Sequence, residues 1–339
     1  MVTDLEAGHL PVMVEEVMAA LSPAPGSFQV DATVGGGGHT VRILEANRPD
    51  GRLLGLDADG AAIARASARL APFGDRVVLR QANFEDLAAL APAAGFDSVD
   101  GVFFDLGLSS DQLADRERSF SFSADGPLDM RFDPSTGTPA RDVVATADER
   151  ALTDIFRRYG EEPAAGRVAR AIVRTRAASP IRTGVDLARV VEAAVGAGRP
   201  AGPRRRRIHP ATRVFQALRI HVNRELEVLP TALAAAVELL RPGGRLVVLS
   251  YHSLEDRIVK RFIAAERRGC VCPPELPVCV CGRDPRLRRA GPSAQPARPT
   301  PDEVARNPRA RSTRLRAAER LDPRLIGSAA THSRAGGLP

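Results

Sequence analysis

Four consecutive glycines and a following aspartate are the residues whose types and spacing most directly suggest chemistry. Gly35–Gly38 follow the apolar segment FQVDATV, and Asp57 ends a second apolar segment, GRLLGLD. A glycine-rich turn after a buried strand lets the backbone approach a ligand closely. An acid at the end of the next strand can accept hydrogen bonds from two ribose hydroxyls. The pair predicts a bound nucleoside cofactor, although a tight turn without a ligand would use the same glycines.

The spacing of the glycines distinguishes between two kinds of nucleoside cofactor. A dinucleotide fingerprint needs glycines at its first, third and sixth positions. Counted from Gly35, the sixth position is Thr40, and the two later registers end on Val41 and Arg42. Asp31 lies just before the turn, where its charge opposes a pyrophosphate but suits the cationic amino acid end of S-adenosylmethionine. The sequence therefore favours S-adenosylmethionine over a dinucleotide.

A further acid, Asp105, ends the apolar segment VDGVFFD. It would lie at the carboxyl edge of a parallel sheet, where open α/β folds bind their ligands. There it can accept hydrogen bonds from the cofactor, from an exocyclic amine, or from both; capping of the next turn is the alternative. Amino-directed nucleic-acid methyltransferases carry two prolines and an aromatic residue after the acid or amide. Leu106, Gly107 and Leu108 follow here, so the likeness is one of position alone.

The cysteines argue against one methylation chemistry. Methylation of a pyrimidine at C5 needs a nucleophilic cysteine beside the methyl donor. All cysteines of this chain lie in the segment CVCPPELPVCVC, far from the predicted strand ends; they are Cys270, Cys272, Cys279 and Cys281. Transfer to an exocyclic nitrogen needs instead an amine in line with the methyl group and an acceptor for its proton. The second chemistry is therefore the better match.

The same cysteines have paired spacing that suits a tetrahedral thiolate site. Disulfides are not expected in a cytoplasmic protein. A CxC pair, however, closes less comfortably around zinc than a CxxC pair, so the sequence leaves the question of a metal open.

The elements that must position these residues form an alternating pattern. Helical stretches separate four apolar runs, which predicts a parallel sheet with right-handed crossovers. The runs are 28–33, 52–57, 76–81 and 99–105, and the helical stretches are 39–47, 60–71 and 84–91. From 111 to 207 the chain is polar and helix-rich, and a long helix is expected over 211–240. A strong strand in GGRLVVLS follows; beyond Arg268 we expect irregular chain until a last strand in STRLRAAER.

Charge suggests a polyanionic partner. The net charge is +7, and from Arg283 to the end thirteen arginines stand against five acids. A second basic cluster covers 204–207. Such stripes fit phosphate contacts, although solvated arginines on a surface are the alternative. The sequence has no apolar stretch long enough to cross a membrane and no signal segment, so a soluble, cytoplasmic protein is expected.

Several long strings resemble one family nearly end to end, the bacterial RsmH (MraW) methyltransferases, which modify N4 of a cytosine in 16S ribosomal RNA. They are HLPVMVEEVMAAL, GGGGHT, DLGLSSDQL, SFSADGPLDMR, YGEE, HPATRVFQALRIHVNRELE, GGRLVVLSYHSLEDRIVKRF and NPRARSTRLRAAER. The resemblance implies an α/β, Rossmann-like class I methyltransferase domain that uses S-adenosylmethionine and acts by direct in-line transfer. It also implies an inserted helical domain for substrate recognition. Small departures are Ser119, where the family commonly has glycine, and Ala58, where a basic residue is frequent.

From this resemblance we expect a discontinuous methyltransferase domain over 1–112 and 208–325, an inserted domain over 113–207 and a flexible tail over 326–339. The expected partner is 16S ribosomal RNA or the small ribosomal subunit, with no membrane. The cofactor contacts implied by the motifs are Gly37, Gly38, His39, Asp57, Phe84 beside the adenine, Asp105 and Gln112.

Other motif residues receive less certain roles. In SYHSLEDR, His252 can orient the cytosine or relay a proton alongside Asp105, whereas a helix cap made by Ser253 is the alternative. Three polar residues of the 211–240 stretch, Arg213, Gln216 and Asn223, lie roughly on one helical face. This face can contact RNA, cap the cofactor site or lie between the two domains. The candidate substrate contacts are Arg213, Gln216, Asn223 and Ser253. Phe120 and Phe122 can stack on a base or pack within their own loop.

Two other functions remain at this point, a nucleotide-dependent oxidoreductase and a ribosome assembly factor with a vestigial cofactor site. The missing sixth-position glycine argues against the first, and the intact Asp57 and Asp105 argue against the second. The sequence leaves open the proton acceptor, the choice between naked RNA and an assembled subunit, and the oligomeric state.

Overall fold

A computed structural model describes residues 11–196, 209–273, 275–276, 279–290 and 296–324. Contacts within the chain define two compact units. Among the described residues, the first, here called the α/β unit, comprises 11–107 and 226–324; the second, the helical unit, comprises 108–225. The expected flexible tail and the basic cluster 204–207 lie outside the described residues.

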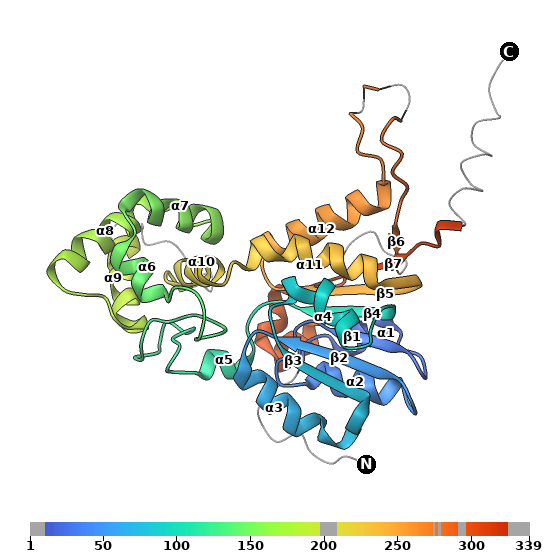
Figure 1. The fold of residues 1–339 in the computed structure, drawn as a ribbon. Helices are drawn as coiled ribbons and strands as arrows, with labels where there is room; N and C mark the ends of the chain where they lie inside the picture. The colour runs from blue at the N-terminus through green and yellow to red at the C-terminus, as the bar shows by residue number, and fades with distance from the viewer. Residues whose placement is uncertain (1–10, 197–208, 274, 277–278, 291–295, 325–339) are drawn as a thin grey trace. The chain divides into compact units, whose positions relative to one another are not determined.

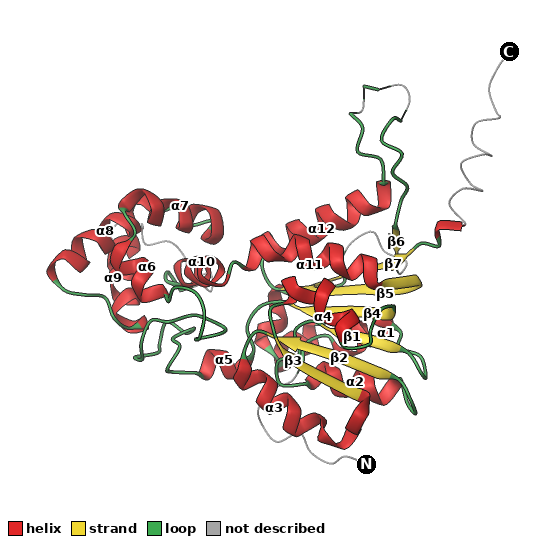
Figure 2. Ribbon diagram, in the orientation of Figure 1, coloured by secondary structure: helices red, strands yellow, loops and turns green. Residues whose placement is uncertain are grey.

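The α/β unit contains one seven-stranded sheet with the order β3-β2-β1-β4-β5-β7-β6 (Figure 2). The first five strands are parallel, whereas β7 runs antiparallel to β5 and β6. The strands are β1 (Phe28–Asp31), β2 (Arg52–Asp57), β3 (Val77–Gln81), β4 (Val99–Asp105), β5 (Leu240–Ser250), β6 (Leu287–Arg289) and β7 (Arg314–Arg320). The strand order reverses between β1 and β4, which is where open α/β sheets bind ligands. The predicted fold class is confirmed.

Helices cover both faces of the sheet (Figure 1). α1 (Val14–Leu21), α2 (Gly38–Ala46) and α3 (Gly60–Leu70) supply one buried apolar cluster, which includes Phe103 of β4. α4 (Leu87–Ala93), α11 (Glu225–Leu239) and α12 (Ser253–Arg268) supply a second cluster, which includes Phe104. Successive strand residues point to opposite faces, so a strand buried on both sides is apolar throughout. This explains the uninterrupted VFF of β4.

The last part of the chain is more regular than predicted. Between Arg268 and β7 the structure has the short strand β6, the helix α13 (Pro301–Arg306) and the 3-10 helix η3 (Pro308–Ser312). β6 pairs with β7 along Leu287–Arg289. The expectation of an irregular segment was wrong there, because pairing with a distant strand, which no local pattern reveals, supplies the hydrogen bonds. Two further 3-10 helices, η1 (Ala71–Arg76) and η2 (Phe84–Asp86), flank β3.

The helical unit consists of six helices among its described residues. They are α5 (Ser110–Ala114), α6 (Ala140–Thr146), α7 (Glu149–Gly160), α8 (Ala165–Ala178), α9 (Gly184–Gly196) and α10 (Thr212–Asn223). A Cβ on Gly160 would lie 2.5 Å from the carbonyl oxygen of Arg213, so α7 and α10 approach too closely for any other residue. The motifs YGEE and HPATRVFQ therefore meet through their backbones.

The long helical stretch expected over 211–240 is divided into two helices in the structure. α10 ends at Asn223, Arg224 takes the left-handed conformation with φ 54°, and α11 begins at Glu225. The amide of Arg224 closes the end of α10 by donating to the carbonyl of Ile220. Continuous apolar periodicity on both sides of Arg224 hid this break, and the boundary between the two units falls at the same place.

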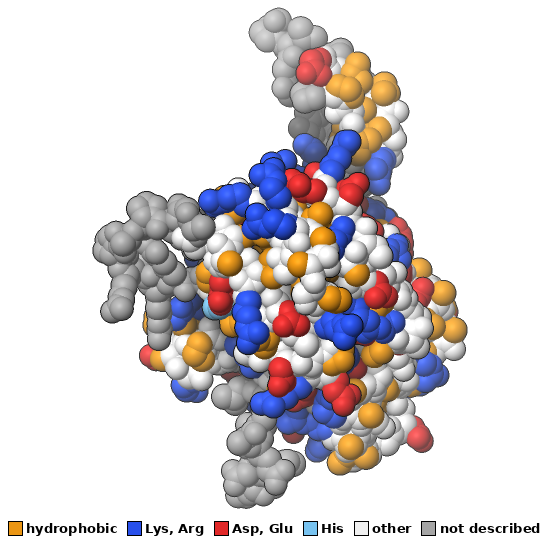
Figure 3. All heavy atoms as spheres, turned by 90° about the vertical axis from the view of Figure 1, so that its left-hand side faces the viewer, with side chains coloured by type: hydrophobic (Ala, Val, Ile, Leu, Met, Phe, Trp, Pro, Cys, Tyr) orange, Lys and Arg blue, Asp and Glu red, His pale blue; other side chains and the backbone are white. Residues whose placement is uncertain are grey.

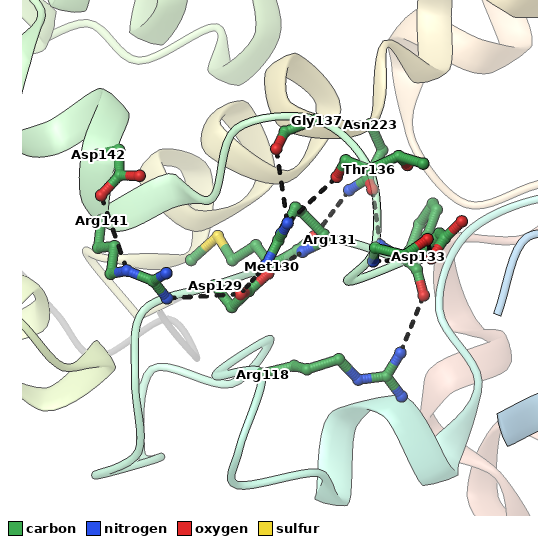
Figure 4. Close-up of polar contacts among 12 residues, drawn as sticks. Arg118, Asp129, Met130, Arg131, Asp133, Thr136, Gly137, Arg141, Asp142 and Asn223 are labelled. Atoms are coloured by element: carbon green, nitrogen blue, oxygen red, sulfur yellow. Dashed lines mark hydrogen bonds and ion pairs between the residues drawn. The ribbon is translucent and has the colours of Figure 1, made fainter. Parts of the chain in front are cut away.

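The loop that carries SFSADGPLDMR is organised by one carboxylate (Figure 4). Asp129 accepts hydrogen bonds from Nε and Nη2 of Arg131, both at 2.8 Å, and from Nη1 of Arg141 at 3.5 Å. Ser119 has φ 49°, a left-handed conformation that favours glycine, and its hydroxyl donates to the carbonyl of Gly126. That hydrogen bond compensates in part for a non-glycine residue at this position.

None of the described helices combines the length and the hydropathy that a membrane crossing requires.

Candidate functional site

The glycine turn joins β1 to the start of α2. Gly35 and Gly37 have φ 53° and 79°, and Gly37 is the N-cap of α2. A Cβ on Gly38 would lie 3.0 Å from Cγ of Pro11, which leaves no room for a side chain. The turn thus brings bare backbone and the amino end of a helix to the carboxyl edge of the sheet, an arrangement suited to a polar or anionic ligand group.

Asp31, the last residue of β1, stabilises this turn through hydrogen bonds. Its carboxylate accepts hydrogen bonds from the Thr33 amide at 3.1 Å and from the Thr40 hydroxyl at 2.7 Å. The side chain is buried, and burial raises its pKa to about 6. Thr40 stands at the position where a dinucleotide fingerprint has glycine, and here its hydroxyl serves the carboxylate of Asp31.

Asp57, at the end of β2, is bound to the same turn. Its Oδ2 accepts from the amide of Gly35 at 2.8 Å, and its Oδ1 accepts from the amide of Asp59 at 2.9 Å. Burial raises the pKa of Asp57 to about 6 despite these two hydrogen bonds. The carboxylate predicted from its spacing therefore also holds the first glycine in place.

Asp105, at the end of β4, is the third acid of this edge. Its Oδ1 accepts a hydrogen bond of 2.7 Å from the hydroxyl of Tyr251, and its Oδ2 lies 3.6 Å from Nε2 of His39. Its amide donates to the hydroxyl of Thr33 at 2.6 Å. The side chain keeps 20% of its surface exposed, so the carboxylate is held on one side and open on the other.

The electrostatics of this edge favour a cationic or proton-donating ligand. Burial, together with the charges of Asp31 and Glu255, raises the pKa of Asp105 to about 7. Burial and the neighbouring Asp105 raise the pKa of the Tyr251 phenol well above its ordinary value, so Tyr251 stays protonated and donates. Carboxylates that repel one another at short range gain from a bound cation or from an approaching N–H group.

His252 and Ser253 begin α12 directly after β5. His252 is the N-cap: its Nδ1 accepts from the amide of Glu255 at 3.4 Å, and its Nε2 lies 3.0 Å from Oε1 of Glu255. The other carboxylate oxygen of Glu255 accepts from the amide of Tyr251 at 2.9 Å. His252 thus occupies the capping position that we assigned to Ser253 as the alternative, and Ser253 lies exposed in the first turn.

Phe84 and Gln112 are the outermost of the predicted cofactor contacts. Phe84 follows β3 at the same sheet edge, half-buried, with its ring edge-on to Phe104 at 5.8 Å between centroids. Gln112 belongs to the helical unit, where it forms a capping box with Ser109 at the start of α5. Its Oε1 accepts from the Ser109 amide at 3.0 Å.

The three polar residues of α10 contact backbone within the helical unit. Gln216 donates to the carbonyl of Tyr159 at 3.2 Å, and the exposed Arg213 donates to that of Glu161 at 3.3 Å. Asn223 accepts from the amide of Phe132 and donates to the carbonyl of Met130, both at 2.8 Å (Figure 4). These contacts connect α10 to α7 and to the loop around Asp129.

We expect Asn223→Ala to lower the free energy of unfolding by about 1–3 kcal/mol, because it leaves a half-buried amide and carbonyl of the loop without this partner. Urea denaturation followed by circular dichroism measures the change. Arg213→Ala is the matched control on the same helix; since it removes one exposed contact, the expected change is within about 0.5 kcal/mol. Equal stability of the two variants would contradict the structural role of Asn223.

The aromatic residues of the loop also pack internally. Phe120 is 5% exposed and stacks on Phe132, with 5.7 Å between ring centroids. Phe122 stacks on His209 at 4.0 Å, with the two rings almost parallel. Of the two alternatives for these rings, the structure supports packing within the helical unit.

Many arginines near the carboxyl end are paired with acids. Asp256, in the first turn of α12, accepts from Arg314 at 2.5 Å and from Arg316 at 2.7 Å, and both arginines belong to β7. Arg286 pairs with Glu266, and Arg288 with Glu319. Figure 3 shows basic side chains interspersed with acidic ones on the visible face. At least these four of the thirteen arginines in the expected basic stripe therefore serve the fold.

Sequence reasoning missed Tyr251, Thr33 and Glu255. Tyr251 received no role in the sequence analysis, yet it is the direct partner of Asp105, 146 residues earlier in the chain. The one available signal was positional: β5 is the neighbour of β4, so the residue that follows the end of β5 lies near the residue that ends β4.

Comparisons with known proteins are consistent over most of the chain. The model of the MraW methylase family matches residues 6–321. Ribosomal RNA small subunit methyltransferase H of Thermomicrobium roseum is 55% identical over 317 residues, which cover 94% of this chain and 95% of the relative. The protein of the same name from Syntrophus aciditrophicus is 49% identical over 313 residues, with 92% and 98% covered. A crystal structure of a putative rRNA methylase from Clostridium thermocellum aligns with 90% of this chain and 94% of its own. At 16% identity and a TM-score of 0.39, that structure is too remote to support a conclusion.

Proposed function

The chain belongs to the MraW methylase family, and from this premise we propose that it methylates N4 of a cytosine in 16S ribosomal RNA. The proposed methyl donor is S-adenosylmethionine, and the proposed partner is the small ribosomal subunit or its RNA. Such an enzyme would act in the cytoplasm, where these subunits are assembled.

The residues of the α/β unit fit this donor. The turn Gly35–Gly38 offers backbone without side chains, and Asp57 ends the next strand beside it. We assign Gly37, Gly38 and His39 to the amino acid end of the donor, Asp57 to its ribose and Phe84 to its adenine; Gln112 and Asp105 complete the set by resemblance to the family. When bound, S-adenosylmethionine supplies an electrophilic methyl group.

Asp105 is the proposed catalytic residue. Its carboxylate would accept a hydrogen bond from the cytosine amine, orient the nitrogen lone pair and take the proton that the nitrogen loses as the new N–C bond forms. A pKa of about 7 leaves a large share of this carboxyl ionised at neutral pH, so it can accept the proton and then release it to water. His252 stays a proposed contact to the base, and Ser253, Arg213, Gln216 and Asn223 stay proposed contacts to RNA.

The observation that carries this proposal is the position of Asp105: it ends β4, is held by Tyr251, and lies on the sheet edge that also carries the glycine turn and Asp57. An acceptor there can reach an amine placed next to the methyl donor. A cysteine nucleophile is not part of this edge, since all cysteines of the chain lie in 270–281.

The test uses purified protein, labelled S-adenosylmethionine and small ribosomal subunits from a strain without this gene, followed by nucleoside mass spectrometry. We expect N4-methylated cytidine with the wild type. Naked 16S RNA in a parallel reaction shows whether the assembled subunit is required. Tight binding of the donor without methylated cytidine in either reaction would overturn the substrate assignment.

Tyr251 is a proposed positioning residue, and Tyr251→Phe tests it. Its hydroxyl donates to Asp105 and lowers the pKa of that carboxyl, so its loss is expected to raise the pKa by roughly 1–2 units. The inflection in the rate against pH should move upward from about 7 by this amount, and activity should recover at high pH. Binding of S-adenosylmethionine should stay within about twofold of the wild type. An unchanged pH profile would show that Tyr251 does not act on Asp105.

A further inference from the structure

The four cysteines lie in the segment between α12 and β6, apart from the residues assigned to methyl transfer. Their Sγ atoms all lie within 4.8 Å of one another. The pairs Cys270–Cys279 and Cys279–Cys281 are 3.5 Å apart, Cys270–Cys281 is 3.8 Å and Cys272–Cys279 is 3.9 Å. Each sulfur thus has at least one neighbour from the other CxC pair.

We propose that Cys270, Cys272, Cys279 and Cys281 bind one zinc ion as a tetrahedral tetrathiolate site. A Zn–S bond of about 2.3 Å places the sulfurs of a regular tetrahedron about 3.8 Å apart. The four measured separations lie on both sides of this value. Two disulfides would instead bring the sulfurs together in pairs at about 2.05 Å.

Backbone donors point to the same arrangement. The residue between the cysteines of each CxC pair donates its amide to a sulfur of the other pair: Val271 to Cys281 at 3.5 Å, and Val280 to Cys272 at 3.3 Å. Hydrogen bonds from amides to ligand sulfurs stabilise the negative charge of a tetrathiolate and orient its ligands. The two CxC turns are therefore built as equivalent halves of one site.

The segment needs a stabilising centre that its side chains do not supply. Its described residues form neither helix nor strand between Gly269 and Arg286. Its large apolar side chains face solvent, with Val271, Leu276 and Val280 exposed by 58%, 45% and 77%. A bound metal supplies folding free energy directly to a segment without an apolar core. The end of the segment next to β6 is held by a separate contact, in which Arg286 donates a hydrogen bond to Glu266 of α12.

Zinc fits better than an iron–sulfur cluster. A cluster distributes its four thiolates over two or more irons, whereas here all four sulfurs lie within 4.8 Å of one another, close enough to bind a single ion. A tetrahedral set of four sulfurs selects a single soft or borderline ion. On binding, each cysteine exchanges its S–H bond for an S–Zn bond and releases the proton to solvent, with no change of oxidation state.

The decisive experiment measures metal in the full-length protein, purified under reducing conditions and without a histidine tag. Elemental analysis by mass spectrometry should find one zinc per chain, and a mercurial reagent should release it to a chromogenic chelator. Replacement by Co²⁺ should give the visible absorption bands of a tetrahedral thiolate site. Three results would each overturn the proposal. The first is a protein that stays zinc-free, with four freely titrating thiols, after incubation with zinc. The second is iron in place of zinc, and the third is intramolecular disulfides.

Variants locate the site. Cys279→Ser should abolish stoichiometric zinc, whereas the matched control Val280→Ser, in the same turn, should retain it. Calorimetric binding of S-adenosylmethionine checks that both variants keep the α/β unit folded. Equal zinc content in the two variants would overturn the assignment, and if Cys279→Ser is insoluble, the wild-type release and Co²⁺ spectra decide alone. Because no readout is methyl transfer, this test does not depend on the proposed RNA substrate, and the zinc and Co²⁺ readouts do not depend on the proposed methyl donor.

Discussion

Asp57→Ala is expected to weaken binding of S-adenosylmethionine by at least ~100-fold, as measured by calorimetry. Two effects combine. The variant loses an acceptor for the ribose hydroxyls, and hydrogen bonds to a charged group contribute about 1.5–3 kcal/mol each. It also releases the amides of Gly35 and Asp59, which the carboxylate holds at 2.8 and 2.9 Å, so the glycine turn loses its support.

Asp97→Ala is the matched control for this change. Asp97 is an exposed aspartate of the same unit that precedes β4, at the opposite end of the sheet from Asp57. Its replacement should leave the affinity unchanged. Asp57→Asn, which keeps one acceptor oxygen, should fall between the wild type and the alanine variant. If Asp57→Ala bound the donor as tightly as Asp97→Ala, the assignment of Asp57 to the ribose would be wrong.

Asp105→Asn is expected to lower the rate of methyl transfer by about 10²–10⁴-fold, the range for loss of a positioned proton acceptor. The wild-type rate should rise with pH and level off above about 7, because burial raises the pKa of Asp105 to about 7 and only the ionised form accepts the proton. The residual activity of the variant should lack this inflection. A single-turnover assay on small subunits, run across the pH range, measures both effects.

The same variant should be more stable than the wild type at alkaline pH. The pKa of Asp105 is about 7 in the folded protein and 3.8 in the reference state. Its contribution to stability is therefore fully present below pH 4 and is lost as the pH rises toward 7, since the folded state resists ionisation. Asparagine does not ionise, so at pH 8 the variant should gain on the order of a few kcal/mol in urea denaturation, and little at pH 4. An inactive variant that is also less stable at pH 8 would instead indicate misfolding.

The parallel part of the sheet, and the edge at which its acidic strand ends gather, could be predicted from the sequence alone. Asp31, Asp57 and Asp105 each end an apolar run, and parallel strands separated by helices bring such ends to one edge. The alternation of strands and helices along the chain is sufficient for this inference. The glycine pattern likewise favours one kind of nucleoside from local sequence, because Thr40 is close in sequence to the turn that it supports.

Partners that are distant in sequence were decided only by the tertiary structure. Tyr251 meets Asp105 across 146 residues, and Asn223 meets Phe132 across 91, so no local pattern reveals either contact. The break at Arg224 depends on where one unit ends and the other begins, which apolar periodicity does not record. The cysteine spacing was compatible with a metal site or with none, and it is the tertiary structure that brings the four sulfurs within 4.8 Å of one another. Sequence determines what each strand end carries, whereas the packing of remote segments determines which side chain stands opposite it.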